Sequence, residues 1–398
     1  MRTILFTALA LLLPVGTRVS AQVDTAGGSD LDIDYWFDVF YPKIFYTPIE
    51  GLAVGAYYAL IQPVQSDDFD SPDPYRISFS LDGQIATSSS RFLKLKANVP
   101  GLANGWRFSA QLTARRRARD NYFGLGNSTV FERDSVTDAQ PNFYRAIRTS
   151  YTLRAEVQRQ LVGPLRALGG LKAERWKISP HDEPSVIAKD LANRVDPTID
   201  VATDDVSIRI GLVFDTRDDR VAPNSGVMIG VGLGVADADV AGDLTYTRTT
   251  VNAQGYWSPS PLLILAARVV GQQMEGTPRL GTFYLIEGGT RFYDSLGGSA
   301  THRALPSNRF LGRDHLFGNL EARYTLSAIP TLYRISLLGF LDAGRVFQTD
   351  DFRITTDDLK VGAGSGLIFQ VGRAGIAGIT VGFGPDGVQT NFHSRWTF

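Results

Sequence analysis

Residues 296–326 read LGGSATHRALPSNRFLGRDHLFGNLEARYTL, a long loop that runs into a strand with two unlike faces. From Leu320 to Leu326 every second residue is apolar, and the residues between them are polar. The polar set includes Glu321 and Arg323. A soluble sheet turns such an apolar face to a core, whereas a transmembrane barrel turns it to lipid and keeps the polar face inside. The stretch therefore predicts a strand, and the rest of the chain decides between these two settings.

The first residues of the chain predict export. Met1-Arg2 supplies a positive charge, the apolar run Ile4–Leu13 follows, and Val19-Ser20-Ala21 has the small residues of a cleavage site. The apolar run falls well short of the ~20 residues that a spanning helix needs. We therefore expect residues 1–21 to be a secretory signal peptide.

Composition narrows the class of protein. The 40 Lys+Arg residues balance 41 Asp+Glu residues, so no basic field favours nucleic acid as a partner. The chain has no cysteine, which leaves no disulfide or thiolate chemistry. Aromatic residues at 11% and 40 glycines are typical of an all-β chain. The most apolar later segment, 262–270, is too short for a transmembrane helix and contains Arg268.

A two-residue period recurs along almost the whole chain. It predicts about fifteen strands, and because bacterial single-chain barrels have an even number, we expect about sixteen in an antiparallel barrel over 51–398. The missing strand is either the Tyr35–Tyr46 segment, which Pro42 interrupts, or a second strand within 74–100. Otherwise residues 22–50 form a short periplasmic or lumenal segment. The expected strands are 51–62, 74–86, 91–99, 104–119, 143–160, 165–178, 205–215, 226–236, 244–257, 261–273, 314–327, 333–347, 359–371, 374–383 and 388–398.

The connections also follow the pattern of an outer-membrane barrel, in which outer loops are long and periplasmic turns short. From residue 165 onward, the long links 179–204, 274–313 and 348–358 alternate with tight turns. This orientation places the end of the last strand in the periplasm. Charges of both signs on the inward faces fit a wet lumen, because isolated charge in a dry core is costly.

The last expected strand ends on three aromatic residues that share one face, Phe392, Trp396 and Phe398. This ending resembles the terminal-phenylalanine signal by which outer-membrane barrels are recognised for assembly. An ordinary edge strand is the alternative. Together with the leader and the alternation, the ending favours a bacterial outer-membrane protein that depends on the barrel assembly machinery for its own insertion.

The loop that precedes the opening strand carries a family resemblance. Leu296-Gly297-Gly298, His302-Arg303-Ala304-Leu305 and Arg309-Phe310 resemble the signature loop of the bacterial surface antigen family, the barrels of the BamA and TamA outer-membrane insertases. In that family the loop folds back into the lumen, and its centre reads Arg-Gly-Phe or Arg-Gly-Tyr. Here the arginine remains, while Ala304-Leu305 replace the glycine and the aromatic residue.

The resemblance implies a role for three charged residues. In such barrels the loop arginine pairs with acidic residues on the lumen wall, and the matching positions are Glu321 and Asp342, the latter within Phe340-Leu341-Asp342-Ala343-Gly344-Arg345. A guanidinium binds carboxylates in a bidentate manner, which would hold a long loop inside a wet channel. The alternative is that Arg303 lies in water on an ordinary loop.

Two further motifs extend the resemblance. Phe214-Asp215-Thr216-Arg217-Asp218 with Pro223-Asn224-Ser225-Gly226 is similar to a periplasmic strand-turn-strand of the family, and we interpret its members as turn residues. The segment Asn121–Asn127 resembles sequences of those family members that have no periplasmic domains. It follows the basic run Arg115–Arg119. We expect the alternate residues 115, 117 and 119 to face the lumen, where they could meet an acidic cluster or lipopolysaccharide phosphate. The alternative is that the run is a solvated strand end.

The sequence favours no catalytic or metal site. None of the four histidines, His181, His302, His315 and His393, has a partner at metal-ligand spacing. The nucleophile pattern Gly-x-Ser-x-Gly does not occur. We therefore expect no metal, no cofactor and no enzyme, with a Ser-His-Asp triad assembled in space as the remaining route to an outer-membrane hydrolase.

The resemblance implies that the barrel inserts or translocates protein or lipid, using a weak seam between its first and last strands. Its partners would be outer-membrane lipid, lipopolysaccharide and client outer-membrane proteins. Family insertases carry N-terminal POTRA repeats that receive clients, and residues 22–50 are too few for one. The alternative function is a passive pore or a structural barrel.

Overall fold

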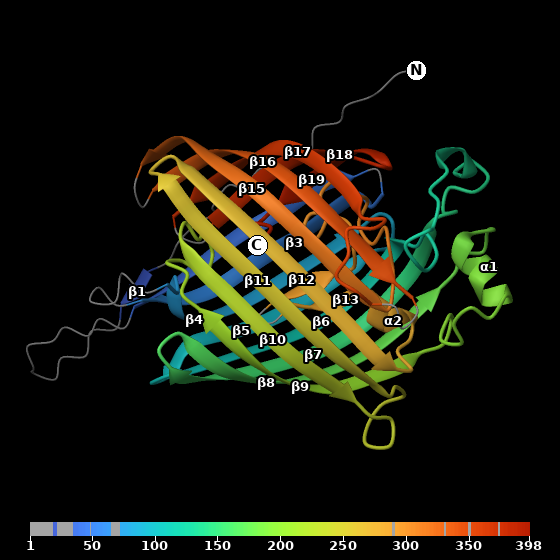
Figure 1. Cartoon of the computed structure of the whole chain (residues 1–398), viewed down its shortest axis with the longest axis horizontal. Helices are drawn as coiled ribbons and strands as arrows, with labels where there is room; N and C mark the ends of the chain where they lie inside the picture. Colours follow the sequence, from blue (N-terminus) through green and yellow to red (C-terminus); the bar gives the residue numbers. More distant parts are fainter. Residues whose placement is uncertain are drawn as a thin grey trace, which may run out of the picture.

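The computed structural model describes residues 19–21, 35–47, 49–64, 72–288, 291–329, 332–348, 352–372 and 375–398. Within these residues, sixteen long antiparallel strands form a barrel in which the strands are tilted (Figure 1). In chain order they are β2 Tyr35–Thr47, β3 Gly51–Pro63, β4 Tyr75–Ala86, β5 Arg91–Ala103, β6 Trp106–Asn121, β7 Arg145–Val162, β8 Leu165–Ser179, β9 Thr203–Asp215, β10 Gly226–Ala236, β11 Tyr246–Ser260, β12 Leu263–Gly276, β15 Asp314–Ile329, β16 Tyr333–Phe347, β17 Lys360–Val371, β18 Gly375–Gly384 and β19 Gly387–His393.

The sixteenth strand is β2, so the barrel begins at Tyr35 and not at residue 51. The expectation of a separate segment over 22–50 is therefore wrong for its described part from Tyr35 onward. Pro42 lies opposite Ala56 of β3 and leaves the strand intact. Proline has no backbone N–H to donate, which an edge strand tolerates because one of its sides has no neighbour.

The N-terminal residues before β2 are described only in part. The expected signal peptide lies outside the described residues except for β1, Val19–Ala21. These three residues pair with the start of β2 in an antiparallel register.

Antiparallel registers connect the long strands in chain order from β2 to β19. Strands β12 and β15 are neighbours, although 37 residues, 277–313, connect them. Strands β2 and β19 are the two edges of this sheet, except that Tyr35–Phe37 at the start of β2 pair with β1. Among the described residues, no register joins one edge to the other.

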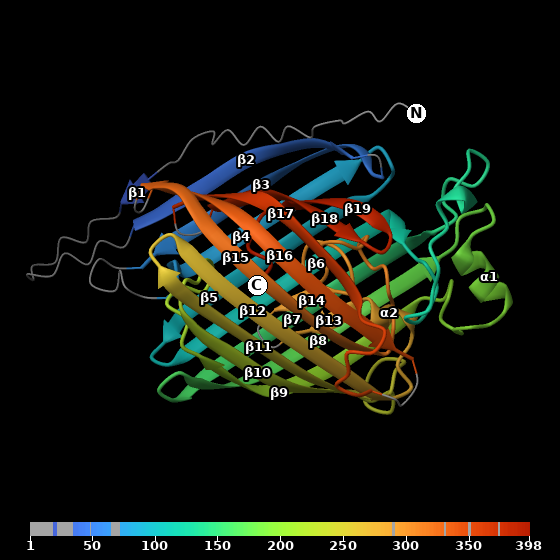
Figure 2. The same ribbon diagram turned by 45° about the horizontal axis from the view of Figure 1, so that its top comes forward.

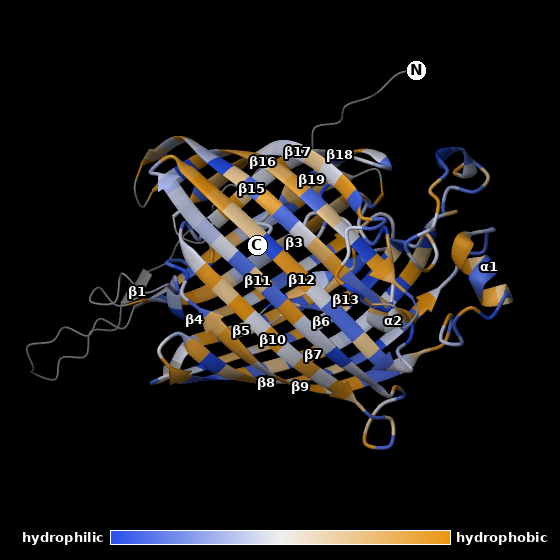
Figure 3. Cartoon of the chain, viewed as in Figure 1, coloured by the Kyte–Doolittle hydropathy of each residue, from blue (hydrophilic) through white to orange (hydrophobic). Residues whose placement is uncertain are grey.

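The outer surface of the barrel is apolar and its inner surface is polar. On β15 Leu320 is 53% exposed, whereas Glu321 is only 4% exposed. Figure 3 shows the same alternation of apolar and polar residues along the visible strands. The apolar face of the opening sequence therefore points outward, as a lipid-facing surface requires.

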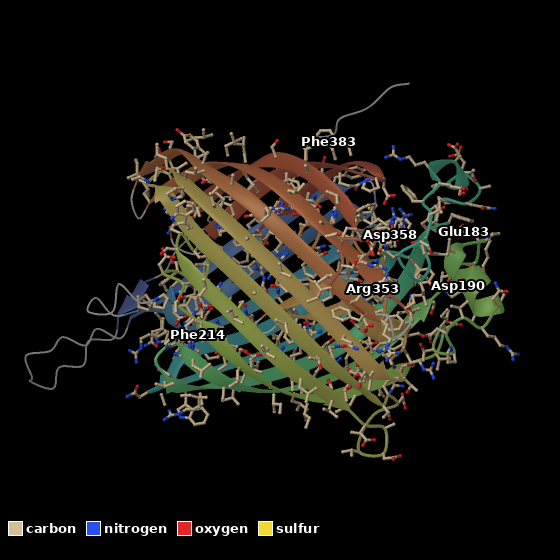
Figure 4. All side chains as sticks on the ribbon, in the orientation of Figure 1. Glu183, Asp190, Phe214, Arg353, Asp358 and Phe383 are labelled. Atoms are coloured by element: carbon tan, nitrogen blue, oxygen red, sulfur yellow. The ribbon has the colours of Figure 1, made fainter. Side chains whose placement is uncertain are left out.

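The two ends of the barrel differ. At one end lie the long connections 122–144, 180–202, 277–313 and 348–359, and helix α1, Val186–Ala192, projects there beyond the strands (Figure 1). Glu183 and Asp190 lie in this projection (Figure 4). The opposite end has tight turns such as 163–164 and 261–262. In bacterial barrels the short turns face the periplasm, so the α1 end is the outer end.

Within the described residues, no helix is long and apolar enough to cross a membrane.

Connection 277–313 folds into the barrel. It contains α2, Leu280–Phe283, and a small hairpin of β13, Leu285–Glu287, and β14, Phe292–Asp294. Figures 1 and 2 both place α2 and β13 behind the front strands, within the outline of the barrel. The loop therefore occupies the lumen and does not extend into solvent.

The chain also ends inside the barrel, which corrects the expected last strand. Strand β19 ends at His393, and residues 394–398 turn inward, so the C-terminus lies in the middle of the barrel outline (Figure 2). Phe392 is 55% exposed on the outer face, whereas Trp396 and Phe398 are 4% and 3% exposed. The three aromatic residues thus do not share a face, because regular alternation stops when the chain leaves the sheet.

Candidate functional site

Arg303 lies at the centre of the folded-in loop and is fully buried. Its Nη2 donates to Asp342 Oδ1 at 2.6 Å and its Nε to Asp342 Oδ2 at 2.9 Å, a bidentate pair. Its Nη1 donates to Glu321 Oε1. Asp342 lies on β16 and Glu321 on β15, so one guanidinium binds the loop to two strands of the barrel wall. We call Arg303, Glu321 and Asp342 the lumenal lock.

The surroundings of the lock fix its geometry. The backbone N–H of Arg303 donates to Asp342 Oδ2 at 2.7 Å, and the guanidinium lies 4.0 Å from the ring centre of Phe340. Glu321 Oε2 accepts a second charged hydrogen bond, from Arg323 Nε at 2.8 Å. Each buried carboxylate therefore has charged and directional partners, which offset the cost of removing it from water.

Asn319 links the lock to the next strand. Its Nδ2 donates to Asp342 Oδ1 at 2.7 Å and to the carbonyl of Thr301 at 2.9 Å. Its Oδ1 accepts from Arg268 of β12, at 2.6 Å from Nη2 and 2.9 Å from Nε. The wall residues from β12 to β16 thus form one hydrogen-bonded network around the loop.

The structure explains why alanine follows the loop arginine. Ala304 is completely buried against β17 and β18, where Gly362, Gly382 and Gly384 face it. A Cβ atom at Gly382 would lie 2.7 Å from the carbonyl oxygen of Arg303, and one at Gly384 would lie 2.4 Å from that of Ala304. Glycines in the barrel wall therefore provide the space into which the loop packs.

Leu305 replaces the expected aromatic residue within an apolar cluster. It is fully buried and packs with Leu296 and Phe310 of the loop and with Val270 and Phe317 of the wall. Apolar burial of a leucine contributes roughly 1.5–3 kcal/mol, so the cluster adds a second attachment beside the lock.

The C-terminal tail is bound to the same network. Arg268 Nη1 donates to the carbonyl of Thr397 at 3.3 Å, and Arg323 Nη2 donates to a main-chain oxygen of Phe398 at 3.2 Å. The guanidinium of Arg323 lies 4.0 Å from the ring centre of Trp396. Loop, wall and tail are therefore held together by three buried arginines, Arg268, Arg303 and Arg323.

The motif at 121–127 supports the loop from the outer end. Asn121 Nδ2 donates to the carbonyl of Ser307 at 2.6 Å, and the backbone N–H of Gly126 donates to the carbonyl of Leu311 at 2.8 Å. Asn127 Nδ2 donates to Asp358 at 2.9 Å. Hydrogen bonds from the side chains of Lys360 and Asn127 lower the pKa of Asp358 below its ordinary value.

The motif at 214–226 forms a turn at the opposite end. Asp218 Oδ1 accepts from the backbone N–H groups of Asn224 and Ser225 at 2.9 and 3.1 Å. Gly226 has φ +98°, a conformation that side chains other than hydrogen disfavour. The carbonyl of Pro223 lies 3.5 Å from Arg323 Nη1, beside the lock network.

Two acidic residues of this end hold arginines in the lumen. Asp215 accepts from Arg217 Nε at 2.9 Å and from Arg220 Nε at 3.1 Å. Arg220 also pairs with Asp73, which precedes β4. Asp215 and Arg217 thus form part of a charged rim, a role that the turn pattern alone does not reveal.

The basic run on β6 divides differently from the expectation. Arg115 and Arg117 line the lumen, and Arg117 Nη2 pairs with Asp294 of the loop at 3.1 Å. Arg119 is exposed and donates to the carbonyl of Ile49. A register shift between residues 117 and 120 breaks the alternation, so the placement of Arg119 in the lumen is wrong.

The surroundings of His315 do not match those of a catalytic histidine. His315 Nε2 lies 2.9 Å from Ser295 Oγ, and both residues are completely buried. Among the described residues, His315 Nδ1 has no hydrogen-bond partner, so no carboxylate orients the ring as a triad requires. In the same part of the chain, no three side chains of the His, Cys, Asp and Glu types form a metal-binding group.

Fold and site together define a class: an outer-membrane β-barrel of sixteen strands whose lumen is occupied by a wall-bound loop. Residues 76–393 match the Omp85 superfamily domain. This chain belongs to the Omp85 superfamily and is a bacterial outer-membrane barrel. The resemblance to the bacterial surface antigen barrels is thereby confirmed at the level of the superfamily.

Solved structures show the same fold at low identity. BamA from Haemophilus ducreyi lacking POTRA domains 1–3 has a TM-score of 0.55 at 14% identity, over 94% of this chain and 74% of that chain. CdiB from Escherichia coli has a TM-score of 0.59 at 10% identity, over 94% and 66%. This chain thus spans about three quarters of the BamA chain and about two thirds of CdiB. A comparison with curated protein sequences finds no significant match.

Proposed function

We propose that this barrel inserts or translocates protein or lipid at the outer membrane, and that it acts at the edge between β2 and β19. The observation that carries the proposal is the pair of sheet edges. Strand β19 has only 7 residues, whereas β2 has 13. No register joins the two within the described residues.

Unpaired strand edges have a physical consequence in a membrane. A backbone polar group without a partner in lipid costs several kcal/mol, so an open edge favours an added strand. A client strand with free N–H and C=O groups would satisfy both itself and the edge. The inward tail helps to keep this edge open, because Thr397 and Phe398 bind Arg268 and Arg323 and the tail does not extend β19.

The occupied lumen supports action at the edge over passive conduction. A wide pore needs a clear lumen, whereas the loop and the tail fill the part of the lumen next to β11–β19. We further propose that outer-membrane lipid, lipopolysaccharide and client barrels are its partners, that the barrel assembly machinery inserts it, and that no residue is catalytic. The inward position of Phe398 in the folded state is compatible with its proposed role as an assembly signal during insertion.

Liposomes that contain the purified protein should accelerate the folding of a second barrel relative to empty liposomes. Because the chain has no native cysteine, cysteine pairs scanned along β2 and β19 provide a matched control. A pair that forms a disulfide should abolish the acceleration, and reduction should restore it. Wild-type liposomes that perform like empty ones would leave only the passive pore or structural barrel. Oxidised pairs that remain fully active would contradict action at the edge between β2 and β19.

A further inference from the structure

A second region of the lumen is open and separate from the lock. It is a chamber of about 740 Å³ between the wall formed by β5–β9 and the inner surface of the folded-in loop and tail. None of Arg303, Glu321 and Asp342 lines it. Its lining reaches Asp73, Arg166 and Arg220 near the short-turn end, so the chamber extends toward the periplasmic side.

The chamber is strongly cationic in a chain that is nearly neutral. Fourteen lysines and arginines line it, against six aspartates and glutamates, whereas the net charge of the whole chain is only −1. Positive charge is therefore concentrated on this surface. A concave surface of one sign with apolar walls behind it focuses the field and attracts ions of the opposite sign.

Ion pairs inside the protein do not neutralise this excess. Each acidic residue of the lining already has a basic partner; for example, Asp294 pairs with Arg117 at 3.1 Å and Glu156 pairs with Arg209. Within the described residues, five lining cations form no ion pair at all: Lys96, Arg115, Arg166, Arg291 and Arg395.

Several guanidinium groups also retain unused donors. Arg107 Nε, Arg148 Nη2, Arg154 Nε and Arg209 Nη1 are buried and have no hydrogen-bond acceptor among the described residues. All four residues line the chamber. A buried charged donor without an acceptor is costly, so a rotation of these side chains that turns the donors toward oxygen acceptors in the chamber would be favourable.

We propose that the chamber is a binding site for a multiply phosphorylated anion. Phosphate groups supply several acceptor oxygens and at least one charge each, which matches guanidinium forks grouped with lysines. The volume lies within the range of about 300–1,000 Å³ that ligand sites occupy. The ligand is either a free phosphate compound or the phosphorylated headgroup of a lipid. This inference does not rest on the proposed insertion activity.

The test uses the full-length protein in zwitterionic detergent, titrated calorimetrically with inorganic tripolyphosphate. The wild type should bind, and the affinity should fall as salt is raised, because phosphate–guanidinium attraction is screened. A Lys96→Gln, Arg115→Gln double variant should bind roughly tenfold or more weakly, as expected when charged hydrogen bonds are removed. Arg116→Gln is the matched control, because Arg116 is on the same strand but does not line the chamber.

A second arm identifies the source of the phosphate. Micelles doped with cardiolipin, whose headgroup carries two phosphates, should displace tripolyphosphate if a headgroup enters the chamber, and micelles doped with phosphatidylcholine should not. No displacement by either would assign the site to free phosphate compounds. The proposal would be overturned if the wild type failed to bind tripolyphosphate at low salt. Equal binding by the wild type and a correctly folded double variant would overturn it as well.

Discussion

Replacing Arg303 with alanine is expected to lower the free energy of unfolding by about 3–5 kcal/mol, because the change leaves two buried carboxylates without their shared partner. Glu321 retains Arg323, and Asp342 retains Asn319, so the barrel should still form. Equilibrium urea unfolding in detergent micelles, followed by the shift of the folded barrel in unheated gel electrophoresis, measures the loss.

Two controls separate the lock from a general effect of removing an arginine. Arg353→Ala removes an exposed arginine whose contact with Asp357 is 3.8 Å long, and it should change stability by less than about 0.5 kcal/mol. A double-mutant cycle between Arg303→Ala and Asp342→Asn should give a coupling of about 1–3 kcal/mol. Additive effects of the two changes would show that this pair does not hold the loop.

The second large effect is expected at the inward tail. Phe398→Ala and Trp396→Ala should each destabilise the refolded barrel by about 3–5 kcal/mol, because both rings are buried against arginines and aromatic residues of the lumen. Phe392→Ala is the matched control. Its ring lies on the lipid-facing surface, so the same truncation leaves no cavity in the lumen.

This comparison distinguishes two roles of the aromatic ending. Refolding into detergent bypasses the assembly machinery, so only contacts of the folded state contribute to the measured stability. If Phe392→Ala proved as destabilising as Phe398→Ala, the three rings would share one environment, as in a straight terminal strand. The yield of each variant in membranes would then report separately on recognition during assembly.

The strands could be predicted from sequence because their information is local. Alternation on β15 and β9 reports directly which face is apolar. All fifteen expected strands are present; the ends of fourteen differ by no more than four residues, and the last, expected over 388–398, ends at His393. The sequence did not identify the sixteenth strand with certainty, because a proline such as Pro42 generally disfavours a strand. Only its place at the edge of the sheet makes it tolerable.

The sequence predicted the three central residues of the site but not the residues that surround them. The resemblance pointed to Arg303, Glu321 and Asp342, and the structure brings the three side chains together. Arg268 and Asn319 belong to the same network. Their contact depends on the pairing register of β12 and β15, which the two-residue period of the sequence does not specify. The tail and the bulge near Arg119 depart from alternation, and no local signal marks where an alternation ends.

The glycines of β17 and β18 show how sequence and packing combine. Gly362 leaves room in the wall, and Ala304 of the loop fills that room: a Cβ atom at Gly362 would lie 2.3 Å from the Cβ atom of Ala304. The change from glycine to alanine at the loop centre therefore remains compatible with a folded-in loop. Its acceptance depends on residues about 60 to 80 positions away along the chain, beyond the reach of any local pattern.

Single-channel recording in planar bilayers tests most directly whether a loop held by Arg303 closes the lumen. The wild type and Arg353→Ala should show small, fluctuating conductance, because the loop, the tail and the wall form one network. Arg303→Ala should show larger and longer openings. A large, steady conductance of the wild type, or identical traces for the wild type and Arg303→Ala, would contradict the account.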